Sequence, residues 1–285
     1  MILGRKAALA PAKINLFLHV GPTGPDGYHP ICSLMAFADI GDLVWLEPAE
    51  RLSLRVEGPF AGALAGEDLE SNLVMRAARA VGAAAVGIVL DKRLPVAAGL
   101  GGGSSDAGAA LRLLRGRDTG DAELEAVAAE LGADGAACLW GRAVLAEGRG
   151  ETLIPAPRLP SLPAVLVNPG VACPTGAVYR AFDALPAGPG ADRPDLPKAF
   201  ADAGEVARFL AGRRNDLEPA AAGLVPAVAA TLARLRAEPE PLLVRLSGSG
   251  ATCFALCADE AAAKRLAARL QASEPGWWVR ACKLG

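Results

Sequence analysis

A glycine-rich stretch between a strand-like and a helix-like segment constrains this chain more than any other feature. It reads Leu94-Pro-Val-Ala-Ala-Gly-Leu-Gly-Gly-Gly-Ser-Ser-Asp106. Residues 86–90 are apolar and predict a strand before it, and apolar residues at helical spacing from Ala107 predict a helix that ends near Gly116. Glycines permit close backbone approach, and a helix N-terminus carries free N–H groups and a positive dipole end. The stretch is therefore predicted to bind phosphate groups.

Two familiar glycine-rich motifs fit this stretch less well. A Walker A loop requires Gly-Lys-Ser or Gly-Lys-Thr after its spacer, and the stretch contains no lysine. A dinucleotide-binding fingerprint could use Gly99, Gly101 and Ser104, but it belongs to a repeating strand-helix alternation that the chain lacks. A serine-capped glycine turn would explain three glycines alone. The added proline, paired serines and amphipathic helix in register favour the phosphate site.

Length and charge limit the classes of partner. The 285 residues are enough for two domains, and the proline-rich segment 153–163 predicts a boundary between residues 1–154 and 164–285. A formal net charge of -2 without a basic run argues against nucleic-acid binding. No apolar run reaches the ~18 residues that a membrane span requires. A small molecule is the expected partner.

The cysteines and the N-terminus suggest a cytoplasmic protein. Six cysteines are scattered without CxxC spacing, which is typical of thiols in a reducing compartment, and two histidines make a structural zinc site improbable. Lys13 and Asn15 interrupt the apolar N-terminal stretch too early for a signal peptide.

The first half of the chain predicts a run of strands followed by helices. Residues 7–20 form a strand with Ile14 and Leu16 on the inward face and Lys13 and Asn15 on the other, where a solvated face is the plain interpretation. Antiparallel strands are expected around residues 34–38, 42–47 and 52–56, followed by a helix that Ser71 caps. Another helix spans residues 121–131. Asp134 follows it at an element boundary, where an N-cap is the usual role.

The second half predicts an α+β sandwich. Strands are expected at residues 164–168, 242–246, 252–256 and 277–281, and helices from Pro174, after residue 219, at 228–236 and at 261–270. Residues 185–197 are expected to form a loop. Ser247, Gly248, Ser249 and Gly250 lie between two of the strands, where they form either a hairpin loop or a second backbone nest for phosphates.

Taken together, these motifs make the chain resemble the GHMP small-molecule kinases over nearly its whole length. The resemblance rests on seven segments in order: Ala10-Pro-Ala-Lys-Ile-Asn-Leu16, Asp26-Gly-Tyr-His29, Pro95 to Ser105, Leu131-Gly-Ala-Asp134, Pro174-Thr175, Arg214-Asn-Asp216 and Ser247-Gly-Ser-Gly-Ala251. It implies an α+β, two-domain GHMP kinase fold with a ribosomal-protein-S5-like N-terminal domain and a ferredoxin-like C-terminal domain.

The resemblance also implies an activity. The Asp-Gly-Tyr-His motif points to a cytidyl diphosphate substrate. The reaction would transfer the γ-phosphoryl group of ATP, accompanied by Mg²⁺, to the 2-hydroxyl of 4-diphosphocytidyl-2-C-methyl-D-erythritol in non-mevalonate isoprenoid biosynthesis. Asp134 matches the catalytic base and Lys13 the neighbouring cation. No protein ligand of Mg²⁺ is implied.

Further site residues follow from the same resemblance. Asn15 would hold the erythritol end, Tyr28 and Tyr179 would sandwich cytosine, His29 would bind the edge of the base, and Thr175 would contact substrate. Asn72 and Lys92 are possible adenine contacts. The ATP phosphates would lie on the loop Pro95, Val96, Ala97, Ala98, Gly99, Leu100, Gly101, Gly102, Gly103, Ser104 and Ser105.

One departure from the family pattern leaves alternatives open. Gly135 and Ala136 follow Asp134 where family members usually have Val-Pro, which would loosen the turn that holds this carboxylate. The alternatives are another GHMP kinase acting on mevalonate, homoserine or a sugar, and a non-catalytic nucleotide-binding relative.

Overall fold

The computed structural model describes residues 7–117, 119–186 and 188–285 and divides them between two compact units. The first unit contains Lys13 and the described residues before it, Ile40–Val96 and Gly101–Gly141; the second contains Ile14–Asp39, Ala97–Leu100 and Arg142–Gly285. The units alternate along the chain. The boundary between residues 1–154 and 164–285 stays a prediction.

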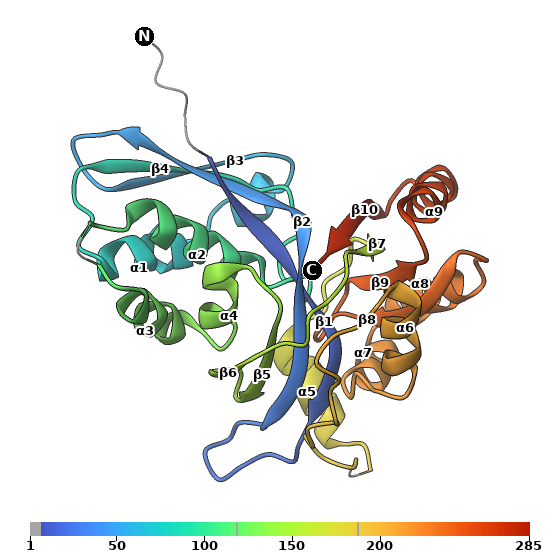
Figure 1. Cartoon of the computed structure of the whole chain (residues 1–285). Coiled ribbons are helices and arrows are strands. Elements are labelled where there is room, and N and C mark those ends of the chain that lie inside the picture. The colour runs from blue at the N-terminus through green and yellow to red at the C-terminus, as the bar shows by residue number, and fades with distance from the viewer. Residues whose placement is uncertain (1–6, 118, 187) are drawn as a thin grey trace. The chain divides into compact units, whose positions relative to one another are not determined.

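The first unit consists of a sheet with helices on one face (Figure 1). Strand β2 (Ile31–Pro48) pairs antiparallel with β4 (Val86–Asp91), β3 (Ser53–Glu57) pairs parallel with β4, and β1 (Ala8–Val20) pairs with β2. The helices are α1 (Leu73–Ala80), α2 (Gly102–Leu114), α3 (Asp121–Leu131) and α4 (Gly135–Trp140). Val44 and Ile88 of the sheet pack against Met75 of α1 and Ala110 of α2, and this apolar contact fixes α2 on the sheet.

The strands of this unit differ from the sequence-based expectation. Residues 34–38 and 42–47 belong to one continuous strand, β2. Gly41 within this strand lets β1 pass close by, since a Cβ atom there would lie 2.0 Å from the Ala10 carbonyl oxygen. The prediction that residues 52–56 are antiparallel was wrong. The chain between β3 and β4 includes α1, and such a crossover connection permits parallel pairing.

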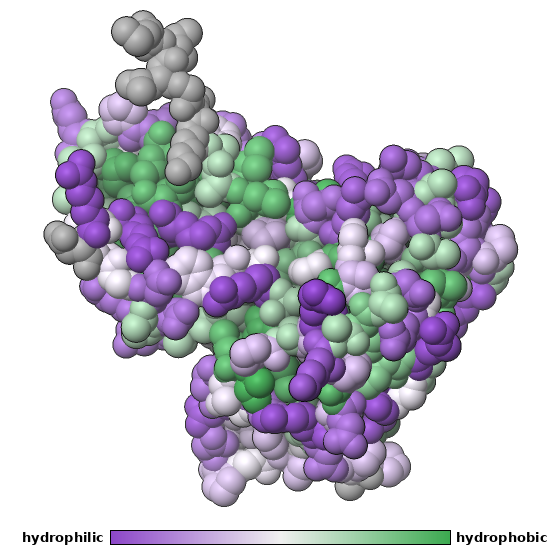
Figure 2. Space-filling view, in the orientation of Figure 1, coloured by the Kyte–Doolittle hydropathy of each residue, from purple (hydrophilic) through white to green (hydrophobic). Residues whose placement is uncertain are grey.

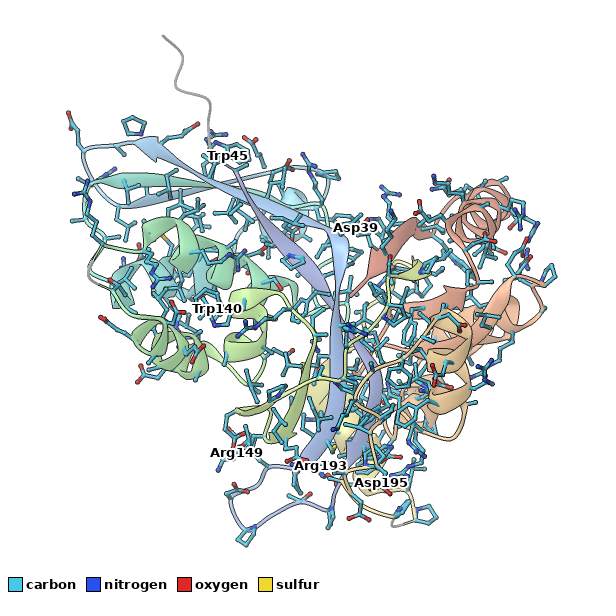
Figure 3. The ribbon with its side chains drawn as sticks, in the orientation of Figure 1. Asp39, Trp45, Trp140, Arg149, Arg193 and Asp195 are labelled. Atoms are coloured by element: carbon cyan, nitrogen blue, oxygen red, sulfur yellow. The ribbon has the colours of Figure 1, made fainter. Side chains whose placement is uncertain are left out.

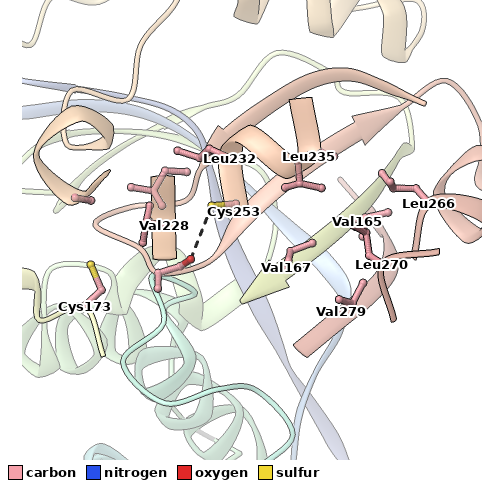
Figure 4. Packing of buried hydrophobic residues seen from close by; sticks show 14 of the residues in the cluster. Val165, Val167, Cys173, Val228, Leu232, Leu235, Cys253, Leu266, Leu270 and Val279 are labelled. Atoms are coloured by element: carbon pink, nitrogen blue, oxygen red, sulfur yellow. Dashed lines mark hydrogen bonds between the residues drawn. The ribbon is translucent and has the colours of Figure 1, made fainter. Parts of the chain in front are cut away.

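The second unit is an antiparallel sheet covered by helices. Its strands run in the order β2, β10 (Trp278–Leu284), β7 (Leu162–Asn168), β9 (Cys253–Cys257) and β8 (Pro241–Leu246), while β5 (Val144–Gly148) joins β2 to β6 (Thr152–Pro155). Its helices are α5 (Thr175–Asp183), α6 (Ala203–Ala211), α7 (Glu218–Leu224), α8 (Pro226–Arg236) and α9 (Glu260–Ser273). Leu232 of α8 and Leu266 of α9 belong to the same buried cluster as Val165 and Val167 of β7 (Figure 4).

Most predicted helices are confirmed, with informative differences at their ends. Helix α3 has the predicted bounds, whereas α1 is capped by Asn72 instead of Ser71, through a bond from the Val74 N–H to Asn72 Oδ1. Helix α2 begins at Gly102, so the glycine run forms its first turn. Helices α4 and α6 and strands β5 and β6 were not predicted, and β6 occupies the start of the proline-rich segment that was expected to be a connector. Residues 185, 186 and 188–197 contain no helix or strand, as expected.

Within the described part of the chain, no helix is long and apolar enough to cross a membrane. Figure 2 shows mainly hydrophilic residues on the face in view, with smaller apolar areas between them.

Candidate active site

In the first unit, Lys13 forms an ion pair with Asp134 and packs against Gly101. Lys13 Nζ lies 3.0 Å from Asp134 Oδ2, and the two side chains are 6% and 31% exposed. The aliphatic part of Lys13 packs under the glycine run, since a Cβ atom at Gly101 would lie 3.1 Å from Lys13 Cε. Gly101 also has a φ of 62°, which favours glycine. The plain interpretation of a solvated lysine was therefore wrong: its stem is buried and its charge faces a carboxylate.

The N-terminus of α2 has the features of an anion site. No side chain caps this helix, and Gly101 precedes it in a left-handed conformation. The first-turn N–H groups of an α-helix have no partner within the helix, and they and the helix dipole favour a negative group. Lys13 adds a positive charge next to this turn.

The predicted phosphate loop is divided between the two units. Pro95, Val96 and residues 101–105 belong to the first unit, and Ala97–Leu100 belong to the second. The side chains of Ala98, Leu100 and Ser105 are buried, whereas Ser104 is partly exposed, so the loop can offer backbone N–H groups and the Ser104 hydroxyl to an anion. Ala97 has a φ of 51°, a conformation that costs a residue with a Cβ atom free energy and is most often found at functional loops.

Asp134 occupies the N-cap position of α4 without acting as a cap. Its side chain accepts no capping hydrogen bond and pairs with Lys13 instead. Gly135 packs so closely on α3 that a Cβ atom there would lie 1.8 Å from the Ala128 carbonyl oxygen, and the Gly135 N–H donates to the Gly132 carbonyl at 2.9 Å. The expectation of a loosened turn was wrong, because the small residue allows α3 and α4 to pack tightly around Asp134.

A buried charge cluster beside α2 was missed in the sequence. Lys92 Nζ lies 2.5 Å from Asp42 Oδ2 and 2.8 Å from Asp106 Oδ2, and all three residues are at least 97% buried. Asp42 Oδ1 also accepts from the Leu94 N–H at 2.8 Å. Lys92 is thus held in ion pairs rather than available for adenine, and Asn72 is the cap of α1. The sequence carried no local signal for this cluster, because Asp42 lies on β2, Lys92 follows β4 and Asp106 lies on α2.

In the second unit, the second glycine-rich loop supports the first one. The Ser247 hydroxyl donates to the Gly99 carbonyl at 2.9 Å and accepts from the Asn15 N–H at 3.3 Å. A Cβ atom at Gly99 would lie 2.3 Å from the Ser247 carbonyl oxygen, so the two loops are in direct backbone contact. The Asn15 side-chain amide donates to Ser33 Oγ at 2.8 Å, which orients the predicted substrate-binding Asn15.

Further hydrogen bonds hold the second loop in place. Asn215 Nδ2 donates to the Leu246 and Gly248 carbonyls at 2.9 and 2.8 Å. Thr175 Oγ1 lies 2.9 Å from Ser249 Oγ at the start of α5. The structure therefore brings Thr175 to the second glycine-rich loop, and Asn215 is a supporting residue from the Arg214-Asn-Asp216 motif.

The predicted base-binding residues also belong to the second unit. The His29 ring lies against the Tyr179 ring, with centroids 5.0 Å apart, and against the edge of Phe182. His29 Nδ1 lies 2.8 Å from the Gly21 carbonyl oxygen, and Nε2 lies 3.0 Å from Thr23 Oγ1. Since both ring nitrogens already have protein partners, the ring holds the turn in place.

Tyr28 is an exposed residue of this turn. It is 58% exposed, and the Arg149 guanidinium lies 4.3 Å from the centroid of the Tyr28 ring. Asp26 pairs with Arg149 and accepts from the Tyr28 N–H at 3.0 Å. Figure 3 shows Arg149 and Arg193 on this part of the second unit, where Arg193 pairs with Glu147. One face of the Tyr28 ring is therefore covered by a cation.

Comparisons with known proteins identify the family of this chain. The family model described as GHMP kinases N terminal domain matches residues 72–142, and that described as GHMP kinases C terminal matches residues 195–275. The chain is 56% identical to a 4-diphosphocytidyl-2-C-methyl-D-erythritol kinase of Caulobacter vibrioides, covering 98% of this chain and 99% of the relative. It is 49% identical to the kinase of that name from Cereibacter sphaeroides, covering 97% and 98%.

A solved structure gives the same result. The crystal structure of a 4-(cytidine 5'-diphospho)-2C-methyl-D-erythritol kinase matches with a TM-score of 0.78 at 37% identity, covering 98% of this chain and 99% of that one. The predicted α+β fold with GHMP kinase N- and C-terminal domains is confirmed. The chain therefore belongs to the GHMP kinases, in the group of the 4-diphosphocytidyl-2-C-methyl-D-erythritol kinases.

Proposed function

We propose that this protein transfers the γ-phosphoryl group of ATP to the 2-hydroxyl of 4-diphosphocytidyl-2-C-methyl-D-erythritol. The names of relatives that match nearly the whole chain support this substrate. The observation that carries the chemistry is the Lys13–Asp134 pair beside the uncapped N-terminus of α2.

In the first unit, the chemistry follows from charge and alignment. Phosphoryl transfer is catalysed chiefly by positioning and by stabilising charge on the transferred group. The N–H groups of the first turn of α2 bind phosphate oxygens, and the Lys13 ammonium offsets negative charge. Asp134 orients the acceptor hydroxyl and accepts its proton late in the reaction, because a carboxylate with an ordinary pKa of ~3.9 is a weak base for an alcohol.

Mg²⁺ accompanies ATP in this proposal. Among the described residues, no cluster of three or more His, Cys, Asp or Glu side chains could hold a metal ion. The residues fit a metal held mainly by phosphate oxygens and water, as is common for nucleotide-bound Mg²⁺. Its contribution would be to neutralise charge on the phosphates.

In the second unit, the turn that ends at His29 binds the cytosine. Tyr179 packs against the His29 ring, and Tyr28, the residue before His29, offers an exposed aromatic ring on the same turn. No hydrogen bond joins the backbone N–H or carbonyl of His29 to another described residue. This pair of groups, a donor and an acceptor, complements the acceptor and donor on the edge of cytosine, so we assign the edge contact to the backbone of His29.

A coupled assay of ADP release tests the proposal. We expect turnover with 4-diphosphocytidyl-2-C-methyl-D-erythritol and none above background with homoserine, mevalonate or galactose. Equal turnover with homoserine would reject the cytidyl substrate, and ATP binding without turnover on any acceptor would favour a non-catalytic relative.

We also propose a cytoplasmic location. All six cysteines are free and buried. Unpaired thiols in this number suit a reducing compartment.

A further inference from the structure

The cluster of Lys92, Asp42 and Asp106 contains more negative than positive charge. Lys92 supplies one ammonium group, and Asp42 and Asp106 supply two carboxyl groups. Asp106 Oδ1 is buried without a hydrogen-bond partner among the described residues. An uncompensated buried charge is costly, so a proton on one carboxyl group would make the cluster neutral.

The cluster lies directly against the proposed phosphate site. A Cβ atom at Gly102, the first residue of α2, would lie 3.1 Å from Lys92 Nζ and 3.7 Å from Asp42 Oδ2. Asp106 follows Gly102 by about one helical turn on the same side of α2. A change of one charge on Asp106 therefore occurs within a turn of the N–H groups that would bind phosphate.

The electrostatic environment indicates which group holds the proton. Burial raises the pKa of Asp106 to about 8, and Asp42 adds to this shift while the Lys92 ammonium opposes it. Burial alone would lower the pKa of Lys92, but the two carboxyl groups raise it, so Lys92 stays charged. The Cys138 thiol of α4 also faces Asp106, and burial raises the pKa of this thiol to about 12, so it stays neutral.

We infer that Asp106 and its partners Lys92 and Asp42 are positioning residues for the phosphate loop, and that the cluster must be neutral for tight ATP binding. This inference rests on the proposed function. Lys92 and Asp42 tie the segment after β4 to the first turn of α2. When Asp106 loses its proton, the added negative charge beneath that turn opposes the phosphates.

The test is the pH dependence of ATP affinity, measured by calorimetry on the full chain at constant Mg²⁺ from about pH 6.5 to about pH 9.5. Asp106→Asn keeps the shape of the side chain but stays uncharged at every pH in this range. At about pH 6.5 we expect the variant and the wild type to bind ATP equally tightly. At about pH 9.5 the wild type should bind ATP about tenfold more weakly than the variant.

Two further variants make the result specific. Asp42→Asn removes the other carboxyl group and should flatten the pH dependence in the same way. This variant provides the test if circular dichroism shows that Asp106→Asn does not fold. Asp121→Asn, an exposed change on α3, should follow the wild type throughout. Parallel curves for the wild type and a folded cluster variant would overturn the inference and leave the proposed function standing. A wild type that binds no ATP would overturn both.

Discussion

The Lys13 ammonium and the Asp134 carboxylate lie 3.0 Å apart, although Lys13 comes from β1 and Asp134 from the turn between α3 and α4. Glycine at residue 101 allows the loop to rest on the Lys13 stem, and glycine at residue 135 allows α4 to pack on α3. The reactive geometry therefore depends on two positions without side chains.

Removing the charge of Asp134 should abolish most turnover without abolishing ATP binding. Asp134→Asn keeps the shape of the side chain but loses the base, so we expect kcat to fall by about 10²–10⁴-fold. The coupled assay measures kcat, and calorimetry measures ATP affinity. Asp121→Asn serves as the matched control on an exposed carboxylate. Turnover close to that of the wild type would show that Asp134 is not the base.

Ser247 should affect the use of ATP by the enzyme, because it supports the predicted phosphate loop. Ser247→Ala removes the hydrogen bond to the Gly99 carbonyl and the acceptor for the Asn15 N–H. Leaving buried backbone groups unpaired costs about 1–3 kcal/mol, so kcat/KM for ATP should fall by about 5- to 150-fold. Steady-state kinetics with ATP varied gives the result. The exposed Ser161→Ala should behave as the wild type, and a Ser247→Ala enzyme with unchanged kinetics would refute the supporting role.

Gly135 should tolerate no side chain. The methyl group of Gly135→Ala would meet the Ala128 carbonyl oxygen, so α4 must shift away from α3. Overpacking of this kind costs about 1–3 kcal/mol, and kcat should fall as Asp134 moves. Denaturant unfolding gives the stability change. Gly62→Ala is the control, because nothing lies within 4 Å of a Cβ atom there. Equal stability of the two variants would contradict the tight packing.

Tyr179 should contribute to the affinity for the cytidyl substrate and not for ATP. Its ring packs against His29 at the proposed base-binding turn. Base–aromatic stacking is worth about 1–3 kcal/mol, so Tyr179→Ala should raise KM for the cytidyl substrate by about 5- to 150-fold. Tyr179→Phe keeps the ring and should restore most of the affinity. An equal rise in KM for ATP would point to general disruption instead.

Local patterns predicted the elements better than the contacts between them. Helix α3, the hairpin of β8 and β9 and the strand β7 follow from apolar periodicity and turn residues, which act over a few positions. The parallel pairing of β3 depends on a long crossover, which no local pattern reports. The pairing direction of β3 was therefore predicted wrongly. Helix α6 was missed although the sequence carries signals for it: Asp202 caps the helix three residues before Glu205, and Gly212 follows its last residue.

The candidate site shows the same contrast. The Lys13–Asp134 pair was expected from two motifs of the family, and its geometry agrees with that expectation. The cluster around Lys92 was not expected, because a buried charge is stabilised by partners far away in sequence, and single aspartates on a strand or helix are usually solvated. The support of Gly99 by Ser247 is likewise a long-range contact.

Asp106 should make the folded state lose stability as pH rises. Burial raises its pKa from the ordinary 3.8 to about 8, so between these values the folded chain holds a proton that the unfolded chain has released. The free energy of unfolding of the wild type relative to Asp106→Asn should thus fall from about pH 4 to about pH 8, by at most ~1.4 kcal/mol per pH unit, and level off above. Denaturant unfolding of both proteins at each pH measures this difference. A difference that is constant or grows with pH would mean that Asp106 is ionised in the folded protein, because only a carboxyl group that keeps its proton on folding gives a falling curve.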